Sequence, residues 1–174
     1  MIPAVFFDRD GTLNEAVVVA GKPYPPASVA QTRLSPGAVE CVAAIKRLGF
    51  HVAIATNQPD AATGKTPRAT IEAINAHVAH ACGIDDVRTC WHTDADGCDC
   101  RKPKPGLLLA AAREGGLDLS RSVMVGDRWR DVEAGRAAGC ATILLGPGYA
   151  ERHAEPDHRA ESLAEVAQIV ARLV

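Results

Sequence analysis

The sequence predicts an α/β fold in which helices cover both faces of a parallel β-sheet. Short apolar runs alternate with longer stretches of helical character along the 174-residue chain, and polar residues gather directly after several of the apolar runs. This alternation is typical of Rossmann-like sheets, whose sites form at the carboxyl ends of the strands. The chain has no evident repeat, low-complexity tract or linker, so we expect residues 1–174 to form a single domain.

Five short apolar segments fit buried strands. The expected strands cover residues 3–7, 50–55, 87–91, 122–125 and 140–145. The segment 87–91 carries the weakest strand signal. Between the first strand and the first helix, residues 14–34 include Pro23, Pro25 and Pro26, which predicts a loop-like insertion.

Five longer segments carry the signals of helices. The expected helices cover residues 36–48, 67–81, 106–114, 129–138 and 162–173. Ser35 and Thr66 are placed to cap the first two, because their side chains can accept hydrogen bonds from the free amides of a first turn. Glycine suits the backbone conformation that ends a helix. It follows four of these segments, at Gly49, Gly83, Gly115–Gly116 and Gly139.

Composition and charge indicate which classes of binding partner are not expected. The formal net charge is -2 and the pI is about 6.3, which gives no indication of a nucleic-acid or membrane partner. No apolar run approaches the roughly 20 residues of a membrane helix. The chain start reaches Asp8, Arg9 and Asp10 too early for a signal peptide. We therefore expect a cytoplasmic monomer, in which six cysteines do not form a disulfide set.

Two carboxylates one residue apart follow the first expected strand, in the segment Asp8-Arg9-Asp10-Gly11-Thr12. Such a pair can share a cation while its side chains point in different directions. One carboxylate could then attack phosphorus while the other transfers protons. Gly11 would allow a sharp backbone turn. The alternative is a polar turn that only ends the strand, since Asp and Gly are common in turns.

Three further polar segments follow other strands. They are Thr56-Asn57-Gln58, Arg101-Lys102-Pro103-Lys104-Pro105 and Gly126-Asp127-Arg128-Trp129-Arg130-Asp131. The hydroxyl of the first and the cations of the second could bind phosphoryl oxygens, and Asp127 of the third could complete a magnesium site. The alternatives are a loop start, a solvated basic loop and, above all for Asp131, a helix-capping acid. Grouped at one sheet edge, these residues supply what phosphoryl transfer needs.

Three thiols and an imidazole crowd into a short polar stretch, at Cys90, His92, Cys98 and Cys100. This donor set matches a closed tetrahedral zinc site. The loop between the donors has little apolar content of its own, so bound metal would fix its fold. Four protein ligands leave no open coordination position, which predicts a structural zinc ion rather than a catalytic one. The other three cysteines lie in apolar segments and are expected in the core.

Together these motifs resemble the haloacid-dehalogenase superfamily of phosphatases. The resemblance is carried by residues 8–14, residues 56–58, the junction from Cys100 to Pro103, and Gly126-Asp127. With the zinc loop, the chain is similar to the branch that holds D,D-heptose 1,7-bisphosphate 7-phosphatase and histidinol phosphatase. The resemblance implies a HAD-like fold without a large cap domain. It also implies catalytic Mg²⁺, structural Zn²⁺ and a small phosphorylated metabolite as substrate.

The resemblance further implies a role for each matching residue. Asp8 would be the nucleophile, and Asp10 the general acid and then the general base. Magnesium would be held by Asp8, the backbone carbonyl of Asp10 and Asp127. Thr56 and Lys102 would stabilise the transferring phosphoryl group. The substrate-binding residues would be Asn57, Arg101, Lys102 and Arg128.

The expected reaction is hydrolysis of a phosphate ester through an aspartyl-phosphate on Asp8. The resemblance implies D-glycero-D-manno-heptose 1,7-bisphosphate as the leading substrate, with histidinol phosphate or another small sugar phosphate as the alternative. Substrate choice would rest on residues 14–34 and the zinc loop. A phospho-accepting signalling module and a zinc-stabilised binding domain are alternatives of other classes. Asp10 argues against the signalling module, because a receiver has no use for an acid that protonates a leaving group.

Overall fold

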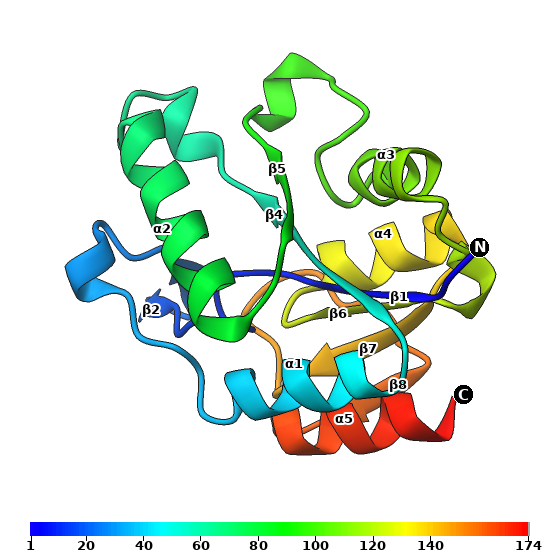
Figure 1. Ribbon diagram of the computed structural model, residues 1–174. Helices are drawn as coiled ribbons and strands as arrows, with labels where there is room; N and C mark the ends of the chain where they lie inside the picture. Colours follow the sequence, from blue (N-terminus) through cyan, green and yellow to red (C-terminus); the bar gives the residue numbers. More distant parts are fainter. Residues whose placement is uncertain (174) are drawn as a thin grey trace.

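A computed structural model describes residues 1–173, which fold around one six-stranded parallel sheet of order β5-β4-β1-β6-β7-β8 (Figure 1). The strands are β1 (Ala4–Phe7), β4 (His51–Asn57), β5 (Asp86–Cys90), β6 (Val123–Gly126), β7 (Ala141–Leu145) and β8 (His158–Ala160). The five strands expected from the sequence are confirmed almost at their expected bounds, and β8 is an addition at the edge of the sheet.

Helices cover both faces of the sheet, as expected. The helices are α1 (Ala38–Arg47), α2 (Arg68–Cys82), α3 (Gly106–Gly115), α4 (Trp129–Ala138) and α5 (Leu163–Arg172). Figure 1 shows α1 and α5 side by side on one face and α3 and α4 on the other. In β1, Val5 and Phe7 pack with α1, α2 and α5, whereas Ala4 and Phe6 pack with α3. Alternate residues of β1 point to opposite faces of the sheet, and both faces are buried. The sequence of β1 is therefore apolar at every position.

The starts of α1 and α2 differ from the expectation. α1 begins after Gly37, and the backbone amide of Ser35 instead donates to the loop that follows β1 (2.9 Å). α2 begins after Pro67, and the amide of Thr66 donates to the carbonyl of Asp60 at 3.2 Å. The prediction that Ser35 and Thr66 cap these helices is therefore wrong, because contacts with the preceding loops hold both residues outside the helices.

Residues 14–34 are more regular than the expected loop. They contain an antiparallel hairpin of β2 (Val17–Val19) and β3 (Lys22–Tyr24). Ala20 and Gly21 turn the hairpin with left-handed φ values of 50° and 73°, as a tight two-residue turn requires. Short 3-10 helices complete the chain: η1 (Val29–Gln31), η2 (Pro59–Ala61), η3 (Asp94–Asp96) and η4 (Leu119–Arg121).

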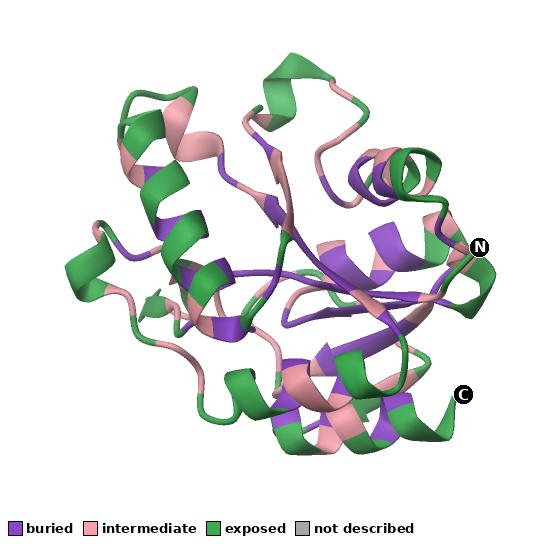
Figure 2. Ribbon diagram, in the orientation of Figure 1, coloured by how far each residue is buried: buried purple, intermediate pink, exposed green. Residues whose placement is uncertain are grey.

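Residues 1–173 contain no cap domain, because even the long connection between β1 and α1 holds only the β2–β3 hairpin and η1. Figure 2 shows a largely buried sheet, with exposed residues on the outer faces of the helices and in the loops. Across this described range, none of the helices has the length and apolar content that crossing a membrane requires.

The register of the sheet determines where the polar motifs meet. Phe7 at the end of β1 pairs with Ile54 of β4 on one side and with Val125 of β6 on the other. The residues that follow these positions therefore emerge at one edge of the sheet. This edge holds Asp8, Thr56 and Asp127.

Candidate active site

A pocket of about 240 Å³ opens beside the carboxyl ends of β1 and β4. Its lining combines residues from the predicted motifs with residues of the β2–β3 hairpin and of the loop before α2. The lining residues are Asp8, Asp10, Pro23, Tyr24, Pro25, Asn57, Gln58, Pro59, Asp60, Lys65, Arg101, Lys102, Arg128, Arg130 and Asp131. The pocket therefore presents two carboxylates of the first motif to a wall rich in cations.

Asp8 is the first residue after β1 and is only 8% exposed. Its backbone amide donates to the carbonyl of Val125 at 2.9 Å, and its side-chain Oδ1 accepts from Lys102 Nζ at 2.9 Å. Burial raises the pKa of Asp8 to about 6; Lys102 opposes the rise and Asp131 adds to it. Asp8 is thus a fixed carboxylate that reaches the pocket, as a nucleophile must.

The ammonium group of Lys102 is enclosed and donates to three oxygens. The acceptors are Asp131 Oδ1 at 2.6 Å, the Ala55 carbonyl at 2.7 Å and Asp8 Oδ1 at 2.9 Å. Burial lowers the pKa of Lys102, but the two carboxylates outweigh burial and hold the pKa above its ordinary value. Since an ammonium has three donors, Lys102 is a fully hydrogen-bonded positive charge next to Asp8.

The backbone of Lys102 is held as firmly as its side chain. Its amide donates to Asn57 Oδ1 and its carbonyl accepts from Asn57 Nδ2, both at 3.0 Å. Arg130 Nη1 also donates to the same carbonyl, at 3.1 Å. Asn57, expected to bind substrate, therefore also joins the end of β4 to the segment that carries the lysine.

Three buried carboxylates form a cluster at the sheet edge. One oxygen each from Asp8, Asp127 and Asp131 lies within 4.8 Å of the other two. Burial, followed by the charges of Asp8 and Asp131, raises the pKa of Asp127 well above its ordinary value. Asp127 Oδ1 is buried and has no hydrogen-bond partner within residues 1–173. Crowded carboxylates with an unpaired oxygen fit a hard divalent cation such as Mg²⁺.

Both carboxylate oxygens of Asp131 accept hydrogen bonds. Its Oδ2 accepts from the Arg128 amide at 3.1 Å, which caps α4, while its Oδ1 accepts from Lys102. A Cβ on Gly126 would lie 2.2 Å from Asp131 Cγ, so only glycine leaves room for this carboxylate. Asp131 therefore both caps α4 and belongs to the charged site.

Asp10 also lines the pocket, and donors hold it from three sides. Arg9 Nη2 donates to both of its carboxylate oxygens at 2.9 Å, Asn14 Nδ2 to Oδ1 at 3.0 Å and Gln58 Nε2 to Oδ2 at 2.8 Å. Arg9 is itself completely buried and donates to Asn75 Oδ1 at 2.7 Å. The direction of Asp10 is thus set by a network that reaches from β1 to α2.

Thr56 is buried at the end of β4. Its Oγ1 accepts from Gln58 Nε2 at 2.9 Å, so its own hydroxyl proton can be donated elsewhere. Gln58 connects Thr56 with Asp10, because the same Nε2 donates to both side chains. The sequence motif indicated Thr56 and Asn57 as site residues but gave no role to Gln58.

Arginines form the polar wall of the pocket, each held by an acid. Arg101 Nε donates to Asp94 Oδ1 at 2.8 Å, and Arg130 Nη1 donates to the same oxygen at 3.1 Å. Arg128 Nε donates to Glu151 Oε1 at 3.0 Å. Since Asp94 lies between His92 and Cys98, the cysteine-rich loop is directly connected to this wall.

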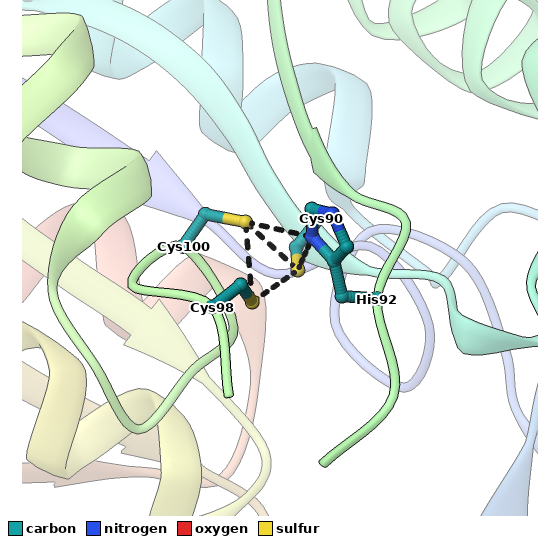
Figure 3. Close-up of side chains that lie close together, drawn as sticks. All are labelled: Cys90, His92, Cys98 and Cys100. Carbon is teal, nitrogen blue, oxygen red and sulfur yellow. Dashed lines mark hydrogen bonds between the residues drawn. The ribbon is translucent and has the colours of Figure 1, made fainter. Parts of the chain in front are cut away.

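The predicted zinc ligands converge in space (Figure 3). The sulfur of Cys100 lies 3.0 Å from that of Cys90, 3.5 Å from that of Cys98 and 3.3 Å from His92 Nδ1. Zinc–sulfur bonds of about 2.3 Å in a tetrahedron separate sulfurs by about 3.8 Å. The Cys98 sulfur, 3.7 Å from that of Cys90 and 3.5 Å from that of Cys100, is close to this spacing, and the Cys90–Cys100 pair is closer together. The four side chains are therefore consistent with a zinc site. Cys41, Cys82 and Cys140 are buried, as expected.

Besides Gln58, two contributors to the site lie outside the sequence expectation. Arg9, between the two acids of the first motif, is buried and donates hydrogen bonds to Asp10. Tyr149, in the loop after β7, donates its hydroxyl to Asp127 Oδ2. The position of Arg9 within the first motif could have been a signal, but Tyr149 is joined to the site only by the tertiary fold.

The chain matches a family model described as haloacid dehalogenase-like hydrolase over residues 15–139. It is 36% identical to D-glycero-beta-D-manno-heptose-1,7-bisphosphate 7-phosphatase of Pseudomonas putida, over 87% of this chain and 86% of that protein. It is 30% identical to the protein of the same name from Escherichia coli K12, over 98% of this chain and 95% of that one.

A solved structure has the same fold. It is the D,D-heptose 1.7-bisphosphate phosphatase from B. bronchiseptica complexed with magnesium and phosphate. The TM-score is 0.85 and the identity 30%, with 99% of this chain and 100% of that chain covered. The similarity therefore extends over the whole described sheet and its helices.

Proposed function

Because this chain belongs to the haloacid dehalogenase-like hydrolases, and within them to the D,D-heptose 1,7-bisphosphate phosphatase family, we propose that it removes the 7-phosphate of D-glycero-D-manno-heptose 1,7-bisphosphate. The chain is a phosphatase. The observation that supports the reaction most strongly is the meeting of Asp8, Lys102 and Asp127 at one edge of the sheet.

In the first step, a carboxylate oxygen of Asp8 attacks the phosphorus of the substrate ester. The new oxygen–phosphorus bond forms as the bond to the sugar oxygen breaks, and Asp10 gives its proton to the departing alkoxide. The product of this step is an aspartyl-phosphate on Asp8. Asp10 suits this role because it faces the same pocket and is held in one direction by Arg9 and Gln58.

In the second step, Asp10 takes a proton from a water molecule, which attacks the phosphorus of the aspartyl-phosphate. Inorganic phosphate leaves and the Asp8 carboxylate is restored. Lys102 and the hydroxyl of Thr56 stabilise charge on the phosphoryl oxygens in both steps. Dividing the displacement into two easier steps is the catalytic advantage of the covalent intermediate.

Magnesium would be held by Asp8, Asp127 and the backbone carbonyl of Asp10, with Asp131 beside them. When bound, it supplies positive charge against the phosphoryl oxygens and the nucleophile. Magnesium in the similar structure supports this choice, as does the unpaired buried oxygen of Asp127. The cluster of Cys90, His92, Cys98 and Cys100 would hold a structural Zn²⁺.

A bisphosphate substrate suits the charge of the pocket. Beyond Lys102, its wall carries Arg101, Arg128 and Arg130, and Asn57 joins them. Guanidinium groups bind phosphate through paired hydrogen bonds, so these side chains could hold the phosphate that is retained. The β2–β3 hairpin contributes Tyr24 to the same pocket.

The substrate assignment predicts a rate difference that phosphate release can measure. D-glycero-D-manno-heptose 1,7-bisphosphate should give a kcat/KM roughly tenfold or more above that of histidinol phosphate, because polar groups built for one substrate are left unpaired by another. The sugar product should retain its 1-phosphate. Faster turnover of histidinol phosphate would contradict the assignment, and a single stoichiometric phosphorylation without turnover would indicate a signalling module.

The zinc assignment predicts a loss of metal when one ligand is changed. Cys98→Ser should abolish stoichiometric zinc, measured by elemental analysis, and lower the melting temperature by roughly 5–10 °C, because bound metal replaces a core in this loop. Activity should fall as well, since Asp94 of this loop holds Arg101. Cys41→Ala is the control, because Cys41 is buried in the other hydrophobic cluster and is not one of the four grouped ligands. Parent-level zinc in Cys98→Ser would contradict the assignment.

The described residues support one structural unit, because a single sheet carries both hydrophobic clusters. We propose that residues 1–174 form one domain, which acts as a monomer in the cytoplasm.

A further inference from the structure

The loop between β7 and β8 crosses the active-site edge, and we call its residues 146–157 the strap. Three contacts hold the strap around its first half. The amide of Ala150 donates to the carbonyl of Gly21 in the hairpin turn at 3.2 Å, Glu151 pairs with Arg128 in the pocket wall, and Arg152 pairs with Glu133 of α4. The strap therefore connects the hairpin, the pocket and α4.

At the centre of these contacts, the strap places Tyr149 against the acid cluster. The Tyr149 hydroxyl donates to Asp127 Oδ2, whereas Asp127 Oδ1 is buried without a hydrogen-bond partner among residues 1–173. The two oxygens of one carboxylate are thus distinguished. One is occupied by a neutral donor, and the other has no partner within residues 1–173, in a carboxylate that has an oxygen within 4.8 Å of oxygens of Asp8 and Asp131.

Packing around this contact leaves it little freedom. A Cβ on Gly11 would lie 1.9 Å from Asp127 Oδ2 and 2.8 Å from the Tyr149 hydroxyl oxygen. Gly11 also has a left-handed φ of 81°, which favours glycine. The glycine of the first motif therefore makes room for the Tyr149–Asp127 pair as well as turning the chain.

We propose that Tyr149 is a positioning residue that fixes Asp127 for magnesium, by occupying Oδ2 so that Oδ1 faces the metal. The inference deepens the proposed function and rests on its magnesium site. Outer hydrogen bonds to a metal-binding carboxylate set its orientation, and their loss weakens metal binding by about tenfold to a hundredfold. Tyr149 contributes no atom to the reaction itself.

The test is Tyr149→Phe, which removes only the hydroxyl. The ring remains, and the contacts of Ala150, Glu151 and Arg152 still hold the strap in place. Binding of Mg²⁺ alone is measured by titration calorimetry on the folded protein, without substrate. We expect the dissociation constant to rise about tenfold or more. In phosphate-release assays, the Mg²⁺ concentration for half-maximal rate should rise in parallel, while kcat at saturating Mg²⁺ stays within about threefold.

Arg152→Gln is the matched control, because it breaks the pair with Glu133 and loosens the strap without touching Asp127. It should bind Mg²⁺ like the parent. Parent-like Mg²⁺ binding by Tyr149→Phe would overturn the inference. Equal weakening by both variants would also overturn it, because strap packing rather than the hydroxyl would then be responsible. The calorimetry needs no phosphorylated sugar, so a wrong substrate assignment leaves its result unaffected.

Discussion

Replacing Asp8 with asparagine is expected to reduce phosphate release by a factor on the order of 10⁴ or more, because the variant has no carboxylate to form the covalent intermediate. The amide is nearly the same size, so the sheet and the pocket should be retained. Initial rates on the heptose bisphosphate at saturating Mg²⁺ measure the effect. Circular dichroism and a melting curve establish that the variant is folded.

The matched control for this variant is Asp85→Asn, which makes the same chemical change at a side chain that is 97% exposed. Its rate should equal that of the parent. Turnover by Asp8→Asn at a rate close to the parent's would show that another group attacks phosphorus. The roles given to Asp10, Thr56 and Lys102 would then lose their basis as well.

Replacing Lys102 with methionine is expected to have the largest effect on stability. The change leaves Asp8, Asp131 and the Ala55 carbonyl without the donor that now serves all three. Removing one partner of a buried charged group costs about 3–5 kcal/mol. Denaturant unfolding at neutral pH without Mg²⁺ should show a loss of this size. Phosphate release should fall on the order of a hundredfold or more, because a fixed positive charge beside the phosphoryl group is lost.

Lys46→Met is the control for that prediction. Lys46 is half exposed and lies 3.8 Å from Asp85, a surface pair whose loss should cost less than about 1 kcal/mol. Activity is compared at a temperature where both variants are folded, so that a lower rate cannot reflect unfolded protein. A Lys102→Met protein as stable as Lys46→Met would show that the buried charges do not depend on the lysine.

The sheet could be predicted because its strands have local signals. Residues 3–7 are apolar throughout, since β1 is buried on both faces, and Asp8 follows it directly. The hairpin and β8 lack that signal. β2 and β3 have no buried face, β3 contains Pro23, and β8 buries only Ala160. Their pairing depends on turn geometry and on tertiary neighbours rather than on a hydrophobic pattern.

The site was predictable to the extent that it follows strand ends. Asp8, Asp10, Thr56, Lys102 and Asp127 all emerge where the sequence placed them, at one edge of the sheet. From the sequence, Asp131 could be either a helix cap or a magnesium ligand. In the structure it caps α4 and also contacts Lys102, and it lies next to Asp8 and Asp127.

Contacts between residues that are distant in the sequence could not be predicted from local sequence patterns. Arg9 is buried, and it donates a hydrogen bond to Asn75 of α2, which is distant in the sequence. Tyr149 reaches Asp127 only because the strap passes over the sheet edge. Neither contact has a fixed spacing in the sequence, so no motif predicts it.

A crystal structure of the protein with Mg²⁺ and beryllium fluoride, a mimic of the phosphoryl group, would test the meeting of nucleophile, metal and cation most directly. Beryllium should be bonded to the Asp8 carboxylate, with magnesium bound by Asp8 and Asp127 and Lys102 close to the fluorides. Beryllium fluoride on another side chain, or magnesium bound away from Asp127, would contradict the proposed reaction.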